Sequence, residues 1–379
     1  MAERCPNHEC GVTLRLVEVS PDVVTVELAN GPARFHALWL RDNASGHESR
    51  HTGSGQRLFD VTELPDRVEV ASAEVVDGRL YVTFEPDRFS SIYESDWLET
   101  HRYDRPVTSG FVGAVPWLAH DLSIHRLMWP DRAKTSSLAE TSKALVRDGV
   151  AIVDGLAAGG NEGPGVVDVA NLWGPARETN YGEVFLVRAE VAPTNLAFTP
   201  NALNVHTDNP YRRPVPGYQL LHCLVASETG GVTVLLDGFQ AAEVFRSEDP
   251  TAFALLTSRS VPFRWRGGGF ELWNRVPVIE VEDGGPADGS IRAIRYNNRS
   301  VEPFDLPFDE MADFYQAYRA FARLLHRPEL EYRFVLNPGQ CMVFDNERIL
   351  HGRDGEADSE RLLKGCYLDR DWIHGKKYV

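Results

Sequence analysis

A histidine and an aspartate stand one residue apart in the stretch NVHTDNPY, residues 204–211. Side chains at positions i and i+2 of an extended strand project from the same face, so His206 and Asp208 can reach one metal ion together. A mononuclear iron(II) site of the oxygenase type uses two imidazoles and one carboxylate on one face of an octahedron, which leaves the other face open. The pair therefore predicts a second histidine elsewhere in the chain.

His351 is the candidate for that second imidazole. It lies in FDNERILHGRDG, directly after the strand-like stretch RFVLNPGQCMVF. A histidine and an aspartate at this spacing also arise by chance in a chain with 12 histidines, so the pair alone is a weak signal. Further residues in a fixed order along the chain strengthen it.

Arg361 and Thr233 are the candidates for holding a co-substrate. Arg361 opens the strand-like run RLLKGCYLD shortly after His351, and a guanidinium suits a small dicarboxylate. Thr233 lies in ETGGVTVLLDGF and offers a hydroxyl to a carboxylate oxygen. Taken singly, the arginine is also typical of a surface ion pair and the threonine of an ordinary strand. Their order, H-x-D, then G-G-x-T, then H, then R, is harder to obtain by chance.

Composition limits the possible partners. The chain has 379 residues and a formal net charge of −16, which disfavours binding to nucleic acid or to an anionic membrane. No uninterrupted apolar run approaches the ~18 residues that a membrane helix needs. The N-terminus lacks the features of a secretory signal, so we expect a cytoplasmic protein without disulfides. The cysteines are scattered without a framework: Cys5, Cys10, Cys223, Cys341 and Cys366.

The chain is predicted to form two domains of α+β class. Residues 11–85 alternate polar and apolar like strands, and Asp77-Gly78 predicts a tight hairpin. The stretch SIYESDWLETH predicts a helix capped by Ser91, and the loss of periodicity after it places the boundary near 105. We therefore expect a small β-rich domain at 1–105 and a larger domain at 106–379.

The larger domain combines many short strands with helices. A helical pattern covers about Thr135 to Arg147, and another places Phe314, Tyr318, Phe321 and Leu325 on one face. Short apolar stretches separated by glycine and proline predict a barrel or sandwich for the remainder.

The sequence resembles the γ-butyrobetaine hydroxylase and trimethyllysine dioxygenase branch of the TauD-like 2-oxoglutarate oxygenases. The resemblance covers nearly the whole chain. It rests on FHALWLRDN in the small domain and on HTDNPYRRPVPGYQLLHCL, TGGVTVLLDGF and LHGRDG with RLLKGCYLD in the large one. It implies a double-stranded β-helix, or jelly roll, in which His206, Asp208 and His351 bind Fe(II). It also implies that Arg361 binds 2-oxoglutarate and that O2 is the second co-substrate of a hydroxylase. A halogenase of this superfamily would have a small residue in place of Asp208.

The chain departs from the family where a structural zinc ion is expected. The three positions that the family fills with cysteine are Ala44, Gly46 and Ser49, and His101 alone matches the fourth. One imidazole cannot hold a structural zinc ion, so structural zinc is not expected. An alternative cluster of Cys5, His8 and Cys10, or of His47 and His51, is left open.

The resemblance also implies a substrate site. The family holds a quaternary ammonium group among aromatic rings by cation–π attraction. The matching positions for the ammonium group are Tyr181, Phe185, Phe198, Asn209 and Tyr367, and those for a substrate carboxylate are Asn195, Asn297 and Asn298. Arg299 follows directly and suits a phosphonate if it faces the site, whereas a solvent-exposed loop position is the simpler alternative.

Four functions follow from these residues. The favoured one is hydroxylation of an unactivated C–H bond in a small zwitterionic metabolite with a cationic amine at one end and an anion at the other. The second is a tailoring oxygenase that acts on a phosphonate or another small acid. The third is a barrel without turnover, which the intact ligand set argues against. The fourth is a zinc hydrolase, which would need a general base that the sequence does not reveal. The expected partner is a small molecule, and a homodimer is left open.

Overall fold

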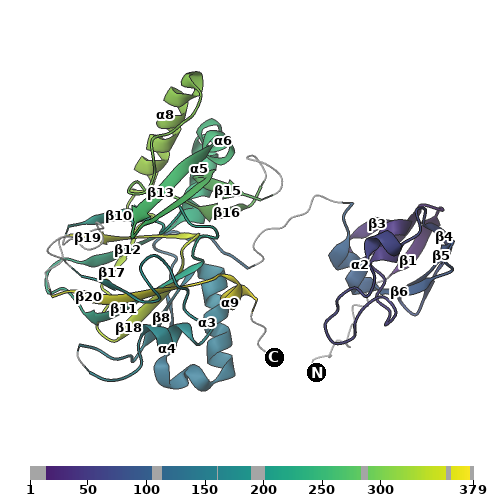
Figure 1. Ribbon diagram of the computed structural model, residues 1–379, viewed down its shortest axis with the longest axis horizontal. Helices are drawn as coiled ribbons and strands as arrows, with labels where there is room; N and C mark the ends of the chain where they lie inside the picture. Colours follow the sequence, from purple (N-terminus) through teal and green to yellow (C-terminus); the bar gives the residue numbers. More distant parts are fainter. Residues whose placement is uncertain are drawn as a thin grey trace, which may run out of the picture. The chain divides into compact units, whose positions relative to one another are not determined.

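The computed structural model describes residues 14–104, 113–159, 161–188, 201–282, 289–355 and 360–375. The chain divides into two compact units, Met1–Val107 and Thr108–Val379, each with its own core (Figure 1). The sequence placed the division near residue 105.

The first unit contains two three-stranded antiparallel sheets with short helices. Its elements are β1 (Arg15–Val19), β2 (Val23–Leu28), β3 (Gly31–His36), α1 (Ala37–Asp42), η1 (Val61–Glu63), β4 (Glu69–Val76), β5 (Arg79–Glu85), β6 (Ser90–Glu94) and α2 (Ser95–His101). Asp77 and Gly78 join β4 to β5 with φ angles of 49° and 74°, which confirms the predicted hairpin. Alternate side chains of β2 and β5, among them Val24 and Phe84, fill the core.

The predicted helix is present as α2, but the expectation that Ser91 caps it is wrong. Ser91 lies within β6, which pairs with β5, and α2 begins only after Glu94. Burial alternates along β6, so that Ser91 and Tyr93 face inward. Pairing with β5 and the burial of Tyr93 therefore outweigh the capping preference of a serine.

The second unit is built around two sheets. The six-stranded sheet has the order β7-β8-β18-β11-β20-β9, and the four-stranded sheet has the order β10-β19-β12-β17. The strands of the first sheet are β7 (His125–Met128), β8 (Val150–Asp154), β9 (Phe185–Val187), β11 (Tyr218–Val225), β18 (Gln340–Asp345) and β20 (Leu362–Leu368). Those of the second are β10 (Leu203–His206), β12 (Val232–Asp237), β17 (Tyr332–Phe334) and β19 (Ile349–Asp354).

The two sheets share a buried layer, and the two-residue period of the strands decides which side chains enter it. Leu235 of β12 and Ile349 of β19 pack in one cluster with Leu221 of β11 and Phe344 of β18. The same alternation directs Thr233, His351 and other residues of these strands toward the space between the sheets. A site between the sheets can therefore collect side chains from many strands.

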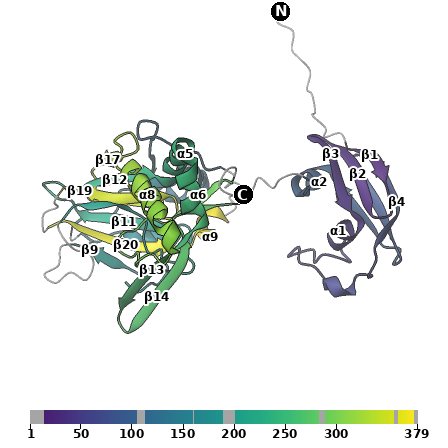
Figure 2. The same cartoon turned by 90° about the horizontal axis from the view of Figure 1, so that it is seen from above.

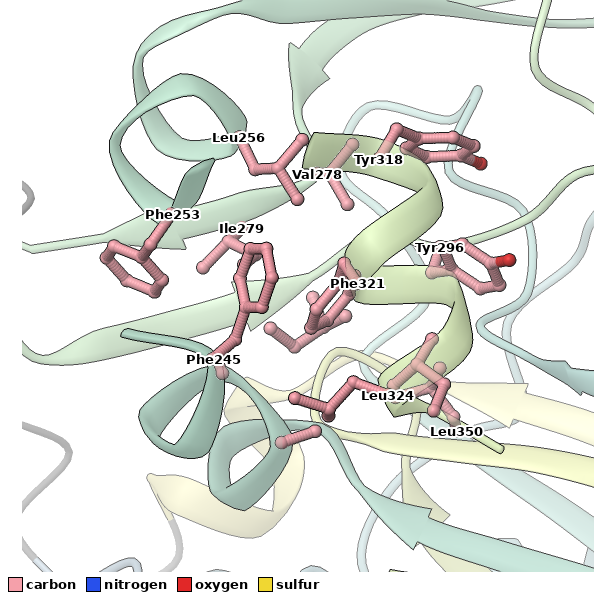
Figure 3. Close-up of a cluster of buried hydrophobic side chains, with 14 of the residues drawn as sticks. Phe245, Phe253, Leu256, Val278, Ile279, Tyr296, Tyr318, Phe321, Leu324 and Leu350 are labelled. Atoms are coloured by element: carbon pink, nitrogen blue, oxygen red, sulfur yellow. The ribbon is translucent and has the colours of Figure 1, made fainter. Parts of the chain in front are cut away.

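Helices cover the outer faces of both sheets. Along the six-stranded sheet lie α3 (Thr135–Asp148) and α4 (Val166–Ala170) (Figure 1). These helices pack Leu145 and Val169 against Leu220 and Val343. Along the four-stranded sheet lie α5 (Gly238–Glu248), α6 (Pro250–Ser258) and α8 (Phe308–Leu324). These helices pack on the sheet through a cluster of buried hydrophobic side chains, and Figure 3 shows Phe321 and Leu324 of α8 in it.

Both predicted helices of this unit are confirmed. Phe314, Tyr318 and Phe321 are buried on one face of α8, and Leu325 is buried directly after its end. The remaining elements are η2 (Trp129–Ala133), β13 (Ser260–Gly267), β14 (Phe270–Pro277), β15 (Ile279–Val281), β16 (Ile291–Ile294) and α9 (Asp371–His374). The hairpin β13–β14 projects from the unit in Figure 2. No helix in the described ranges is both long and apolar enough to cross a lipid bilayer.

Candidate active site

His206 and His351 lie opposite each other on adjacent antiparallel strands. Their Cα atoms are register partners in the β10–β19 pair, and their ring centroids are 4.3 Å apart. The candidate ligand atoms of these two histidines and of Asp208 all lie within 4.8 Å of one another. Three side chains chosen for their type and order in the sequence thus meet at one point.

Asp208 reaches this point by a different route from the one expected. Strand β10 ends at His206, so the aspartate is not part of it. Asn346 holds it instead: its Oδ1 accepts from the backbone N–H of Asp208 at 2.7 Å, and its Nδ2 donates to the backbone oxygen at 3.0 Å. The turn after β10 and a buried asparagine therefore position the carboxylate, which lies 3.3 Å from Nε2 of His206.

The protonation states suit a metal ion. Burial, and then the charge of Arg299, lowers the pKa of His206, while burial and His206 lower the pKa of His351 to about 3. Burial works to raise the pKa of Asp208, but its neighbours His206, His351 and Arg299 outweigh burial and hold the pKa well below its usual range. Neutral imidazoles and an ionised carboxylate are the forms that bind metals.

The tautomer of His206 is set by its neighbour. Its Nδ1 lies 2.8 Å from the backbone oxygen of Asn204 and donates to it, which leaves Nε2 as the ligand atom. Two imidazole nitrogens and one carboxylate fit the facial arrangement of mononuclear non-haem iron(II). In the part of the chain that the structure describes, this is the one group of three or more such side chains that could hold a metal ion.

A cavity of about 620 Å³ contains the three side chains. Every sequence-predicted site residue that the structure describes lines it: Tyr181, Phe185, His206, Asp208, Asn209, Thr233, Asn297, Asn298, Arg299, His351, Arg361 and Tyr367. Asn195 and Phe198 lie outside the described residues.

One part of the cavity is suited to a dicarboxylate. Thr233 and Arg353 are register partners on β12 and β19, and Arg361 directly precedes β20. Arg353 is buried at 7% exposure and donates to the backbone oxygen of Asn201. Four apolar residues of one buried cluster line the same cavity: Leu221, Leu336, Met342 and Leu363.

Aromatic rings line another part. Tyr367 stacks on Phe185 with centroids 5.1 Å apart, and Phe185 lies 6.1 Å from Tyr181. Asn209 contributes no ring. It adopts a φ of 54°, and its Oδ1 accepts a 2.6 Å hydrogen bond from the hydroxyl of Tyr211.

The amides of Asn297 and Asn298 bond to the protein itself. Asn297 donates to the backbone oxygen of Thr207 at 2.8 Å and accepts from the backbone N–H of Arg299 at 3.0 Å. Asn298 donates to Tyr296 at 3.0 Å and accepts from Tyr318. Both asparagines therefore shape the loop that carries Arg299.

Arg299 faces the cavity, so the alternative of a solvent-exposed loop arginine is wrong. Its side chain is 22% exposed, and its terminal nitrogen lies 3.8 Å from Oδ1 of Asp208. A guanidinium thus lies beside the candidate metal ligands.

Sequence reasoning missed several residues that line the cavity, among them Tyr211, Gln219, Arg264, Trp265 and Arg353. Arg353 could have been found, because strand alternation puts it on the same face as His351. Trp265 gave no local signal, since it lies on a hairpin whose position depends on tertiary packing.

The chain resembles known dioxygenases over most of its length. Residues 116–367 match the model of the family described as taurine catabolism dioxygenase TauD, TfdA family. Gamma-butyrobetaine dioxygenase of Pseudomonas sp. (strain AK-1) is 33% identical over 360 residues, 92% of this chain and 91% of that protein. The human gamma-butyrobetaine dioxygenase is 28% identical over 353 residues, 89% of each chain. Mitochondrial trimethyllysine dioxygenase of Bos taurus is 28% identical over 378 residues, 96% of this chain and 87% of that protein.

The fold, the ligand set and these matches define an iron(II)- and 2-oxoglutarate-dependent dioxygenase, and the chain belongs to the TauD family. Within the family it falls in the branch of the gamma-butyrobetaine and trimethyllysine dioxygenases. The predicted α+β class, the enzyme class and the cofactors Fe(II), 2-oxoglutarate and O2 are confirmed. A barrel without turnover and a zinc hydrolase are thereby set aside.

Proposed function

We propose that this enzyme hydroxylates an unactivated C–H bond of a small zwitterion that carries a methylated, cationic amine at one end and an anion at the other. The observation that carries the proposal is the cavity itself. It brings the His-Asp-His group together with aromatic rings on one part of its wall and with Arg299 on another. The named activities of the relatives, on γ-butyrobetaine and trimethyllysine, support the same substrate class.

His206, Asp208 and His351 hold the iron. Iron held there, with 2-oxoglutarate and O2, would supply the oxidising chemistry: one oxygen atom of O2 goes into the succinate formed with loss of carbon dioxide, and the other enters the substrate C–H bond as a hydroxyl group. The protein's own part is to keep both imidazoles neutral and the carboxylate ionised, and to fix them through Asn204 and Asn346. The carboxylate brings one negative charge, which offsets part of the charge of the cation.

Arg361, with the hydroxyl of Thr233, holds the far carboxylate of 2-oxoglutarate. A guanidinium can bind that carboxylate through two parallel hydrogen bonds. The apolar side chains of Leu221 and Leu363 exclude water from the methylene groups between the two ends.

Three further assignments belong to this proposal. The two sheets of the second unit are the halves of a double-stranded β-helix, which their shared buried layer supports. The first unit, proposed to span 1–105 with the catalytic domain at 106–379, is the small domain of this branch without its zinc ion. The enzyme acts in the cytoplasm.

Succinate release tests the function. Purified enzyme with iron(II), 2-oxoglutarate and γ-butyrobetaine should form succinate together with a hydroxylated product. His206→Ala, Asp208→Ala and His351→Ala should each abolish succinate formation, whereas His326→Ala, with a ring 51% exposed, should not. Full activity in one of these three variants would show that the replaced residue is not a metal ligand.

A second candidate function is oxidation of a phosphonate, and the position of Arg299 favours it. The guanidinium lines the cavity and could bind the extra charge of a phosphonate. Arg299→Ala should raise the KM of an ammonium phosphonate at least about tenfold more than that of the matching carboxylate. Equal changes in the two KM values would exclude a phosphonate-specific role.

A further inference from the structure

Aromatic side chains form a continuous series along the cavity wall, and two of them come from outside the predicted set. From Tyr367, next to Asp208, the series runs through Phe185 and Tyr181 to Trp265 and Tyr211. The Trp265 ring centroid lies 6.3 Å from that of Tyr181, nearly edge-on at 68°, and 6.4 Å from that of Tyr211, at 25°. All five rings line the same cavity.

The hairpin β13–β14 holds Trp265 firmly. Every residue from Ser260 to Gly267 pairs with a partner on β14. A Cβ atom at Gly267 would lie 2.6 Å from Cζ2 and 2.8 Å from Cη2 of the Trp265 ring. Any larger residue at position 267 would therefore clash with the indole, which lies across the α-carbon of Gly267. This contact fixes the direction in which the indole points.

The electrostatic surroundings suit a cation at Trp265. The neighbouring guanidinium of Arg264 is paired with Glu271 and Glu302, so its charge is largely balanced. Indole is the strongest of the aromatic side chains in cation–π attraction, whereas Phe185 offers a weaker face. Without Trp265, the series of rings would lack the side chain that attracts a cation most strongly.

We propose that Trp265 is a specificity-determining residue that forms a wall of the quaternary ammonium subsite. This rests on the proposed function, because it names the residue that selects the cationic end of the substrate. The hairpin β13–β14 then sets substrate choice, although it contributes nothing to the iron site.

The competing explanation is structural, since Trp265 also packs against the cluster beneath α8. The test therefore compares two ligands of the same shape: γ-butyrobetaine and 5,5-dimethylhexanoate, in which carbon replaces the charged nitrogen. Dissociation constants are measured by calorimetry without oxygen on the full chain with iron(II) and 2-oxoglutarate. The matched control is Trp273→Leu, because Trp273 lies on the same hairpin and is 58% exposed.

Trp265→Leu should raise the dissociation constant of γ-butyrobetaine about tenfold and that of the neutral analogue less than about threefold. Trp265→Phe should give an intermediate value, and Trp273→Leu should match the wild type. Gly267→Ala should resemble Trp265→Leu, since the added methyl group displaces the indole. If Trp265→Leu does not fold, the same two dissociation constants in Trp265→Phe and Gly267→Ala test the proposal.

Equal weakening of both ligands would overturn the proposal and make Trp265 an apolar or structural residue. A wild-type preference for γ-butyrobetaine that survives in Trp265→Leu would also overturn it, while leaving the proposed function intact. A wild-type enzyme with no preference for the cationic ligand would instead refute the proposed substrate class, and the role of Trp265 with it.

Discussion

The hydroxyl of Tyr367 donates a hydrogen bond of 2.8 Å to Oδ2 of Asp208. Burial, and then the nearby charge of Asp208, raises the pKa of Tyr367 well above its usual range, so the phenol remains a donor at any physiological pH. The bond occupies one carboxylate oxygen and leaves Oδ1, which lies 3.3 Å from Nε2 of His206. One ring of the substrate cavity thus also orients a candidate metal ligand.

Tyr367→Phe should weaken iron(II) binding about tenfold, because residues that orient a metal ligand typically contribute ~10- to 100-fold in affinity. The ring, and its stacking on Phe185, would remain. An anaerobic iron(II) titration measures the change. Tyr181→Phe is the control, since its hydroxyl lies 3.4 Å from that of Tyr211 and not on a carboxylate. An unchanged iron affinity in Tyr367→Phe would show that the backbone contacts of Asn346 suffice to orient the carboxylate.

Arg361→Ala should weaken 2-oxoglutarate binding by ~2–5 kcal/mol, the usual cost of removing one member of a buried charge pair. Iron(II) affinity should stay the same. The matched ligand is 2-oxopentanoate, which lacks the far carboxylate and should lose little affinity in the variant. If both ligands weaken equally, the arginine does not contact that carboxylate, and Arg353 becomes the candidate, to be tested by Arg353→Ala.

The sequence predicted the three metal ligands because residue type and the two-residue period of a strand are local properties. The two-residue period placed His351 and Thr233 on the inward faces of their strands, and the register of β10 and β19 then joined His351 to His206. Asp208 was predicted correctly as a candidate ligand, but strand alternation with His206 does not explain its position. The strand ends before it, and a hydrogen-bonding asparagine from a distant segment does the positioning. Residue type was therefore informative even where the expected geometry was not.

The substrate wall was less predictable, because it depends on contacts between segments far apart in the sequence. Trp265 enters through a hairpin that the sequence could not orient. The amides of Asn297 and Asn298, expected to bind substrate, line the cavity and also bond to Thr207, Tyr296 and Tyr318. Only tertiary packing decides whether a polar side chain near a cavity is available to a ligand.

The loop in which the family resemblance implied zinc ligands is held by arginines. Arg50 donates to the backbone oxygen of Ala44 at 3.4 Å and to Oδ1 of Asn43 at 3.3 Å. Arg57 donates to the same amide oxygen at 3.2 Å and to Asp42 at 2.5 Å. We predict that elemental analysis of iron-stripped protein finds no stoichiometric zinc. Arg50→Ala should speed amide hydrogen exchange in residues 43–58, with a loss of only about 1 kcal/mol, because these bonds are long and partly exposed.

Arg67→Ala is the control for this loop, because its side chain is 75% exposed. It should leave both hydrogen exchange and zinc content unchanged. One zinc ion per chain, lost when Cys5 or Cys10 is replaced, would contradict the prediction. Those cysteines lie outside the described residues.

His374 should make the iron-free protein less stable as the pH falls. Burial, and then the charge of Arg370, lowers its pKa to about 4, and its Nε2 lies 2.9 Å from the hydroxyl of Tyr218. An unfolded histidine has a pKa of about 6.5, so between about pH 6.5 and 4 the unfolded state takes up a proton that the folded state refuses. In His374→Gln the side chain cannot take up this proton, but it can still form a hydrogen bond with Tyr218. Between pH 7.5 and 5, the urea midpoint should therefore fall less in His374→Gln than in the wild type or in the control His326→Gln. An equal fall in all three proteins would show that His374 is protonated in the folded state at pH 5.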